Sequence, residues 1–280
     1  MEDLLHGTFH FHSTYSHDGR STLSEIATSL CERGFSFCVM TEHFEDFDPQ
    51  KFERYKQEIT ETSSIFRSRG FVLIPGIEVN LSGLDTIVFP VREFSQITQL
   101  LSKAEDPERR LFKVLAHPTK YSFEAVVRHL AKYEINGIEL WNQQADGRHM
   151  PPLGFFRSVR AAPWRNQERY FFGCDLHNVN LTVSNIISIN AKTPRTCEAI
   201  VDALINGEFR SRNVPTGIEY HNGPERTDFE TWLQTLLEKP YYQGNFLQGV
   251  RYCLRAFYRA LPRRMQKSVN DLKNSVRNKL

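Results

Sequence analysis

Residues 4–12, LLHGTFHFH, join an apolar, strand-like run to two histidines at its end. Residues two apart on a strand project to the same side, so His10 and His12 are expected to point together. The next residues, STYSHDG (13–19), add His17 and Asp18 a few positions later. Imidazole and carboxylate groups brought this close are suitable ligands for a divalent metal ion, so this stretch predicts a strand that leads into a metal site.

Similar apolar runs recur along the chain with helical patterns between them. The runs cover residues 4–12, 35–43, 71–79, 84–91, 111–118, 136–142 and 169–177. Thr22 stands three residues before Glu25, as in a capping box, and Asp48-Pro49 is typical of another helix start. Alternating strands and helices indicate parallel strands with crossover connections, and about seven of them predict an α/β barrel that is closed or nearly closed.

Polar residues gather near the carboxyl end of these runs. They are His10 and His12, Glu42 and His43, Glu78, His117, Glu139, and Asp175 and His177. In a β/α barrel the carboxyl ends of the strands form the face on which active sites are built. One such histidine is usually an ordinary core or surface residue, but the whole set favours a shared site. Cysteine is absent from it except for Cys174, which favours an open catalytic site over a structural zinc cage.

Five motifs in this chain resemble those of the polymerase and histidinol phosphatase (PHP) family of metal-dependent phosphoesterases. In chain order they are HFHSTYSHDG (10–19), TEH (41–43), IPGIEVN (74–80), LAHP (115–118) and GCDLH (173–177). The resemblance implies a distorted seven-stranded (β/α)7 TIM-like barrel. It also implies a PHP-type catalytic domain over residues 1–225 and two or three divalent ions, which would be zinc, manganese or iron.

The resemblance further assigns the metal ligands by position. One ion would be held by His10, His12, Glu78 and Asp175, a second by Glu78 and His117, and a third by Asp18, His43 and His177. In this scheme Glu78 bridges the first two ions.

The chain departs from the family pattern at three positions. Glu42 stands where the family usually has aspartate and is expected to orient a ligand. His17 can replace Asp18, and the sequence leaves both assignments open. Many members with three ions carry a further histidine on the strand after the glutamate, but this chain has none there, and Asp85 is the nearest replacement. The second ion is therefore expected to be oxygen-rich in its ligands, weakly held or missing.

Two basic residues in loops near the strand ends are candidates for binding a phosphate substrate. Arg148 is favoured, because a guanidinium group can bind phosphate through two parallel hydrogen bonds. Lys120, which follows the LAHP motif, is the second candidate. The alternative for each is an ordinary solvated side chain.

The C-terminal residues are strongly basic. Residues 251–280 contain nine lysines and arginines against Asp271 alone, a charge of +8, so residues 1–250 carry −6 of the total of +2. Apolar residues at helical spacing after Asn245 predict a basic amphipathic helix within an extension formed by residues 226–280. This segment could cover the flank of the barrel, attach to an anionic membrane surface through residues 245–280, or dock a protein or nucleic acid.

The resemblance, together with the clustered ligands, implies a metal-dependent hydrolase of a small phosphomonoester, with a metal-bound hydroxide as the nucleophile. The alternatives are a nucleic-acid phosphodiesterase, which the acidic charge of residues 1–250 disfavours, and a membrane-associated metal-binding regulatory module without turnover. The five cysteines form no CxxC pair, which fits reduced thiols. The sequence has no apolar run long enough to suggest a leader or a membrane span. We therefore expect a cytoplasmic protein, which would be peripheral at the inner membrane face if the tail binds lipid.

Overall fold

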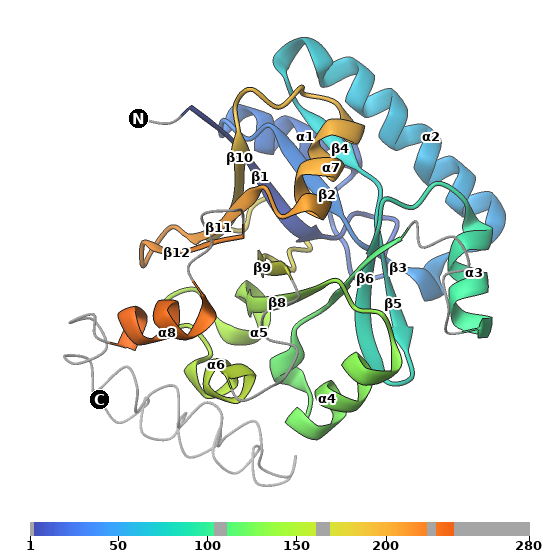
Figure 1. The fold of residues 1–280 in the computed structure, drawn as a ribbon. Helices are drawn as coiled ribbons and strands as arrows, with labels where there is room; N and C mark the ends of the chain where they lie inside the picture. The colour runs from blue at the N-terminus through green and yellow to red at the C-terminus, as the bar shows by residue number, and fades with distance from the viewer. Residues whose placement is uncertain (1–2, 104–110, 161–168, 223–227, 238–280) are drawn as a thin grey trace, which may run out of the picture. The chain divides into compact units, whose positions relative to one another are not determined.

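The computed structural model describes residues 3–103, 111–160, 169–222 and 228–237 (Figure 1). The chain divides into two compact units, Met1–Glu230 and Thr231–Leu280. The helix predicted after Asn245 and the rest of the basic tail lie outside the described residues, so the three roles considered for this segment stay predictions. In the described part of the chain, no helix is long and apolar enough to cross a membrane.

The described strands form two mixed sheets of six strands each (Figure 1). The first has the order β12-β11-β10-β1-β2-β4, with β1 Leu4–Phe11, β2 Phe37–Met40, β4 Val72–Ile74, β10 Asn185–Asn190, β11 Phe209–Asn213 and β12 Ile218–His221. The second has the order β3-β5-β6-β7-β8-β9, with β3 Glu42–His43, β5 Ile77–Leu81, β6 Leu84–Phe89, β7 Phe112–Leu115, β8 Gly137–Asn142 and β9 Arg169–Gly173.

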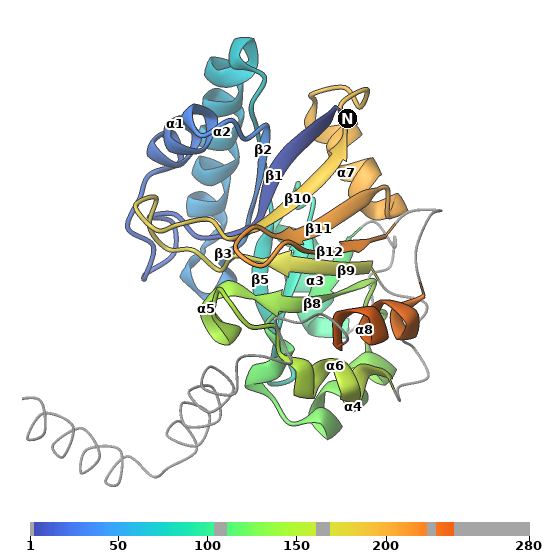
Figure 2. The ribbon, with the colours of Figure 1, turned by 90° about the vertical axis from the view of Figure 1, so that its left-hand side faces the viewer.

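The two sheets meet beside β1, at the strand that carries the first histidines. After β9, the Cys174 amide donates to the Phe9 carbonyl at 2.8 Å, and the His12 amide donates to the Leu176 carbonyl at 2.8 Å. The strands β10 and β11 also lie against β9, as Figure 2 shows from the side. The carboxyl ends of β1 and β9, which are far apart in sequence, are thereby brought together.

A mixed α/β fold is confirmed, but the predicted distorted seven-stranded (β/α)7 barrel is not, and no closed barrel is found among the described residues. The predicted all-parallel pattern breaks where β5 pairs with β6 and β6 pairs with β7, because both pairs are antiparallel. Ser82 and Gly83, with φ of 51° and 93°, join β5 to β6 in a turn too short for a crossover helix. The run 35–43 is also divided, because β2 ends at Met40 and β3 begins at Glu42.

Helices α1 to α7 surround these strands, and most of α8 belongs to the second unit (Figure 1). The described helices are α1 Leu23–Glu32, α2 Pro49–Phe66, α3 Phe94–Lys103, α4 Phe123–Lys132, α5 Gln143–Asp146, α6 Leu153–Arg160, α7 Cys197–Asn206 and α8 Phe229–Leu237, with short 3-10 turns at Phe44–Asp46, Arg67–Arg69 and Pro118–Lys120. The capping box predicted at Thr22 is present. Asp48 caps α2 as predicted, since its side chain accepts from the Lys51 amide at 2.7 Å.

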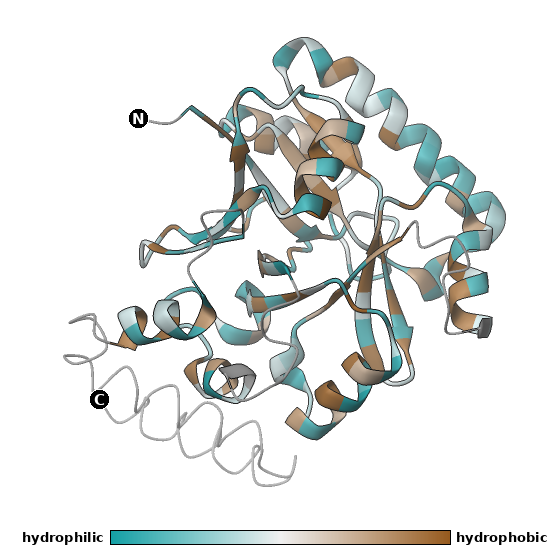
Figure 3. Cartoon of the chain, in the orientation of Figure 1, coloured by the Kyte–Doolittle hydropathy of each residue, from teal (hydrophilic) through white to brown (hydrophobic). Residues whose placement is uncertain are grey.

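The core lies between the strands and under the helices, where Figure 3 shows the hydrophobic residues concentrated. Phe9 and Phe171 stack in it with ring centroids 4.5 Å apart, and both are fully buried. Aromatic pairs of this kind add to the stabilisation that burial itself gives. Because Phe9 immediately precedes His10, this packing fixes the backbone at the base of the candidate site.

Candidate metal centre

All residues that the sequence predicts as metal ligands lie together, but not all of them lie at strand ends: Glu78 is the second residue of β5, and Asp18 lies in the loop after β1. Four overlapping groups have ligand atoms within 4.8 Å of one another: His12, Asp18, His43 and His177; His10, His117 and Asp175; His10, His12 and Glu78; and Glu78, Asp85 and His117. We call these residues the metal centre. Two lower-ranked candidates, His17 and Glu42, belong to none of the four groups.

Glu78 occupies the middle of the metal centre and is 3% exposed. Its carboxylate oxygens lie 2.9 Å from Nε2 of His117, 3.3 Å from Nδ1 of His43 and 3.4 Å from Nε2 of His10. Burial favours the neutral acid, but the imidazoles around the carboxylate, first that of His10, hold the pKa of Glu78 well below its usual range. Glu78 is therefore suited to stay ionised while buried.

Asp175 faces the same two histidines from the other side. Its Oδ1 lies 3.4 Å from Nε2 of His10 and 3.4 Å from Nε2 of His12. Burial opposes ionisation, yet the His10 imidazole beside the carboxylate lowers the pKa of Asp175 well below its ordinary value. Two ionised carboxylates thus flank the same imidazole nitrogens.

The donor atoms of the metal centre fit a cation. Nε2 of His10 and Nε2 of His12 are buried and have no hydrogen-bond partner among the described residues. Buried polar atoms are nearly always paired, and buried charges are paired or coordinate metals. The unpaired nitrogens lie next to the carboxylates of Glu78 and Asp175, so a divalent ion between them would satisfy both kinds of group.

Strained backbone conformations coincide with the metal centre. His10, His117 and Asp175 have φ of 71°, 28° and 52°, in a region that residues other than glycine rarely adopt. Such conformations cost about 1–3 kcal/mol each and persist only where the surroundings enforce them. His10 also lies where the pairing of β1 with β2 shifts register, between Phe9 and Phe11. This irregularity contributes to the orientation of His10, which strand alternation alone does not explain.

Glu139, which the sequence places in the shared set of polar residues but to which it gives no ligand role, lies beside the candidate ligands. It is fully buried on β8, and its Oε1 lies 2.8 Å from Nδ1 of His10. Its Oε2 accepts from the His117 amide at 2.7 Å and from Nδ2 of Asn142 at 3.0 Å. One carboxylate therefore restrains two strained positions and leaves Nε2 of His10 facing the centre. The available signal was a carboxylate inside the otherwise largely apolar run 136–142.

Gly173, at the end of β9, makes room for this carboxylate. A Cβ atom at this position would lie 1.6 Å from Oε1 of Glu139. The glycine of the GCDLH motif is therefore required by close packing, since no side chain can occupy the space that Glu139 fills.

Glu42 supports His12 through a serine. It is fully buried, which raises the pKa of Glu42 to about 6, although hydrogen bonds from Ser13 and Ser16 act in the opposite direction. The Ser16 hydroxyl donates to Glu42 at 2.7 Å and lies 3.4 Å from Nδ1 of His12. The main-chain amide of His43 also donates to the Ser16 oxygen, at 3.0 Å. Glu42 thus belongs to none of the four ligand groups, but it fixes Ser16, whose hydroxyl lies beside Nδ1 of His12.

Asp18 and His17, which the sequence leaves as alternatives, lie in different surroundings. Oδ2 of Asp18 is 3.0 Å from Nε2 of His177, and Oδ1 is 3.4 Å from Nε2 of His43. The side chain of His17 is 63% exposed, and its Nδ1 lies 2.9 Å from Asp46. The geometry therefore places Asp18 in the centre and directs His17 toward Asp46.

The remaining candidates lie at the edge of the site. Asp85 is 34% exposed and has its Oδ2 3.9 Å from Nε2 of His117. Lys120 is 47% exposed, with Nζ 3.8 Å from Oδ2 of Asp175. Arg148 is half-buried and its carbonyl accepts from Nδ2 of Asn213 at 3.1 Å, but its guanidinium forms no ion pair within the described residues. Of the two predicted substrate-binding residues, Lys120 is thus the one placed beside a ligand.

Comparisons with known proteins show the fold. No family model matches the chain, and no curated protein matches it by sequence. A two-domain protein from Bacteroides vulgatus, containing a predicted PHP-like metal-dependent phosphoesterase, matches with a TM-score of 0.51 and 18% identity, over 76% of this chain and 65% of that one. The fold is PHP-like. This confirms the resemblance predicted from the five motifs at the level of the fold.

Two structures of Endonuclease Q also match the fold of this chain. One, in complex with a 27-mer duplex with an abasic lesion at the active site, matches with a TM-score of 0.51 and 16% identity, over 79% of this chain and 60% of that one. The other, from Pyrococcus furiosus, matches with a TM-score of 0.50 and 15% identity, over 72% and 56%. The chain spans less than two thirds of the length of each of these three structures.

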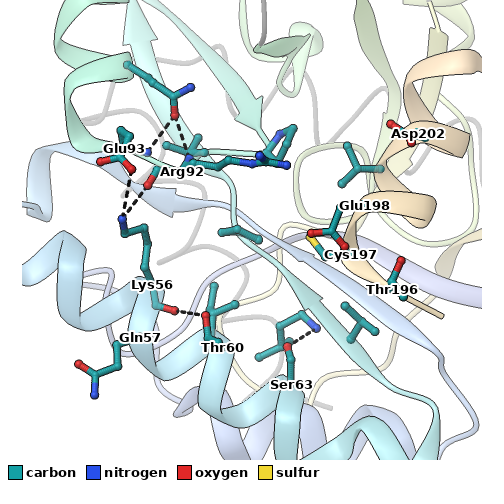
Figure 4. A pocket seen from close by; sticks show the side chains of 18 of the residues that line it. Lys56, Gln57, Thr60, Ser63, Arg92, Glu93, Thr196, Cys197, Glu198 and Asp202 are labelled. Carbon is teal, nitrogen blue, oxygen red and sulfur yellow. Dashed lines mark hydrogen bonds and ion pairs between the residues drawn. The ribbon is translucent and has the colours of Figure 1, made fainter. Parts of the chain in front are cut away.

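A separate groove of about 1480 Å³ lies between α2, α7 and the segment that follows β6 (Figure 4). Lys56 on α2 donates to the Arg92 carbonyl at 2.7 Å and lies 3.8 Å from Glu93. Acidic and basic side chains line it together, and no residue of the metal centre does.

Proposed function

We propose that this chain is a metal-dependent phosphoesterase that hydrolyses small phosphomonoesters with two or three divalent ions. The observation that carries the proposal is the pair of buried, unpaired Nε2 atoms on His10 and His12, which face the carboxylates of Glu78 and Asp175. The PHP-like fold, found in a protein containing a predicted phosphoesterase, supports the same reaction class.

In this proposal each ligand set is supplied by the groups described above. His10, His12, Glu78 and Asp175 would hold one ion, Glu78 and His117 a second, and Asp18, His43 and His177 a third. Bound divalent ions would stabilise negative charge on the phosphoryl oxygens and lower the pKa of a water molecule. Zinc, manganese and iron suit the mixture of imidazole and carboxylate donors.

The protein groups around the ligands have three tasks. Glu139 accepts from Nδ1–H of His10, and the Ser16 hydroxyl can accept from Nδ1–H of His12, so both Nε2 lone pairs stay available. Glu78 and Asp175 would be ionised when a divalent cation lies between them and these nitrogens. Lys120, half-exposed next to Asp175, would bind a phosphate oxygen of the substrate, with Arg148 as the second candidate.

A nucleic-acid phosphodiesterase is the second candidate function. It is favoured by the likeness to Endonuclease Q with a bound DNA duplex. The charge of −6 over residues 1–250 disfavours it, because nucleic-acid binding relies on basic surfaces that neutralise phosphates.

Turnover assays on the full chain, loaded separately with Zn²⁺ and Mn²⁺, test these alternatives. We expect hydrolysis of p-nitrophenyl phosphate and of members of a phosphometabolite panel. Little hydrolysis of bis(p-nitrophenyl) phosphate is expected, and no nicking of a duplex with an abasic site. Preferred cleavage of the diester or the duplex would favour the second candidate. Metal binding without turnover on any phosphoester would contradict both and favour a regulatory binding module.

A further inference from the structure

Asp18 differs from the histidines of its ligand group in how it is held. His43 lies in β3 and His177 follows the bridge between Phe11 and Leu176, whereas Asp18 lies in the loop after β1. The Asp18 side chain is 41% exposed, and among the described residues its carboxylate has no ion pair or hydrogen bond except those with His43 and His177. The place of Asp18 therefore depends on the backbone that carries it.

The loop that carries Asp18, residues 13–19, is folded on itself. The Ser16 amide donates to the Ser13 carbonyl at 2.9 Å, and the Gly19 amide donates to the Ser16 carbonyl at 3.1 Å. A Cβ atom at Gly19 would lie 1.8 Å from the Ser13 carbonyl oxygen, so the close approach of the two ends requires glycine. The loop is therefore a compact unit, and its contacts with the rest of the chain set its orientation.

Tyr15 attaches the first half of the loop to α2 and its surroundings. Nζ of Lys51 donates to the Tyr15 carbonyl at 2.8 Å, and the Tyr15 hydroxyl donates to Glu58 at 2.8 Å. The Tyr15 ring also lies parallel to that of Phe47, with centroids 6.1 Å apart. These contacts end three residues before Asp18, so another group must fix the backbone that leads into it.

Asp46 fixes the second half of the loop. Its Oδ2 accepts from the main-chain amide of His17 at 2.8 Å and lies 2.9 Å from Nδ1 of the same residue. Asp46 ends the 3-10 turn Phe44–Asp46, which directly follows His43. One turn thus follows the ligand His43 and also holds the residue before Asp18, so it links the positions of these two ligands.

We propose that Asp46 is a positioning residue for the ion that Asp18, His43 and His177 would hold. Through the His17 amide, Asp46 fixes the backbone that places the Asp18 carboxylate beside the two imidazoles. The bond to the main chain carries this role, and the ring of His17 is not needed for it. This inference rests on the proposed function, because it concerns the third ion assigned there.

Zinc binding tests this role step by step. The full chain and its variants are dialysed against Zn²⁺ at a series of buffered free concentrations, and the ions bound per chain are counted by elemental analysis. Asp18→Asn identifies the binding step that depends on Asp18, because it weakens that step most. We expect Asp46→Ala to shift the same step to a free Zn²⁺ concentration about 10-fold higher and to leave the other steps unchanged, since groups that support metal ligands contribute about 10–100-fold to affinity.

A double change separates positioning from a general loss of structure. In the Asp18→Asn background, Asp46→Ala should cause no further shift of this step, because the ligand that Asp46 positions is already lost. An equal shift in both backgrounds would show that Asp46 acts on His43 or on the fold, and would overturn the proposal.

Two further variants separate the hydrogen bond from the charge. Asp46→Asn keeps an oxygen that can accept from the His17 amide, so it should restore most of the affinity that Asp46→Ala loses. Glu45→Ala removes a carboxylate from the same turn, but within the described residues Glu45 is exposed and makes no hydrogen bond to the loop. Glu45→Ala should therefore bind Zn²⁺ as the wild type does. Equal weakening by Glu45→Ala, or no restoration by Asp46→Asn, would assign the effect to charge and overturn the proposal.

Other outcomes separate this inference from the proposed function. Wild-type Zn²⁺ binding by Asp46→Ala would overturn the role of Asp46 even if the protein hydrolyses p-nitrophenyl phosphate. The expected shift in a protein that hydrolyses no phosphoester would support the role of Asp46 and contradict the phosphoesterase. A chain that binds no Zn²⁺ would overturn both.

Discussion

His12 in the metal centre and His129 on α4 are both buried imidazoles with very different surroundings. Burial lowers the pKa of each to about 4. The Nε2 atom of His129 lies 3.1 Å from the Thr86 hydroxyl, whereas the Nε2 atom of His12 is unpaired and faces the carboxylate of Asp175. A buried histidine is thus distinguished as a ligand by an unsatisfied lone pair beside a carboxylate, and burial alone does not show it.

Removing the unpaired nitrogens gives the largest expected effect. The double change His10→Ala and His12→Ala deletes the donors that Glu78 and Asp175 face, so metal content should fall and phosphatase activity should drop to background. Circular dichroism should show a retained fold, because the packing around Phe9 is unchanged. Activity that survives the double change would contradict the assignment of the centre.

Loss of the carboxylate that orients His10 should have the next largest effect. Glu139→Gln places an amide nitrogen against either His10 or the donors of His117 and Asn142, so metal affinity should fall by about 10–100-fold in a chelator competition assay.

The control for this change is Asp146→Asn. Asp146 is also a buried carboxylate and accepts from Thr119 at 2.6 Å, but it makes no hydrogen bond to a ligand side chain. A loss of affinity equal to that of Glu139→Gln would show that any buried carboxylate nearby has the same influence.

A smaller effect is expected at the edge of the centre, where Asp18 and His17 are neighbours in sequence. Asp18→Asn should reduce metal content and activity, since the carboxylate lies within 3.4 Å of His43 and His177. His17→Asn should leave both near the wild-type level, because its ring faces Asp46. If elemental analysis showed that His17→Asn lowers the metal content and Asp18→Asn does not, His17 would replace Asp18 as the ligand.

The smallest effect is expected for His129 and concerns stability. Below its ordinary pKa of 6.5, an unfolded chain takes up a proton on His129 that the folded protein refuses until about pH 4. The free energy of unfolding therefore decreases as pH falls through this window. His129→Gln can still accept from Thr86 and does not titrate, so its melting temperature should fall less between pH 7 and pH 5 than that of the wild type.

The exposed His149 gives the matched control. The His149→Gln variant should keep the full pH dependence, because it leaves His129 and its contact with Thr86 intact. The measurement is the melting temperature of the wild type, His129→Gln and His149→Gln at pH 7 and pH 5, with the same metal content in all three. A decrease in the His129→Gln variant as large as in the wild type would remove His129 as a cause of acid sensitivity.

Local signals in the sequence predicted several strands and helix starts of this protein correctly. The runs before His10, His117 and Asp175 form strands, and the caps at Thr22 and Asp48 are formed as predicted, because hydrophobic patterning and capping act within a few residues. The same motifs predicted a PHP-like fold. They did not predict the antiparallel β5–β6 and β6–β7 pairs, because strand direction depends on which distant partner completes the hydrogen bonds.

By itself, the sequence determined which residues can bind metal and that they follow strands. Only the tertiary structure decided how each one is used. It placed Asp18 among histidines and turned His17 to Asp46, and it brought Glu139 against His10 across 129 positions of chain. Donor chemistry is a property of the residue, whereas orientation and pairing depend on contacts between segments that are distant in sequence.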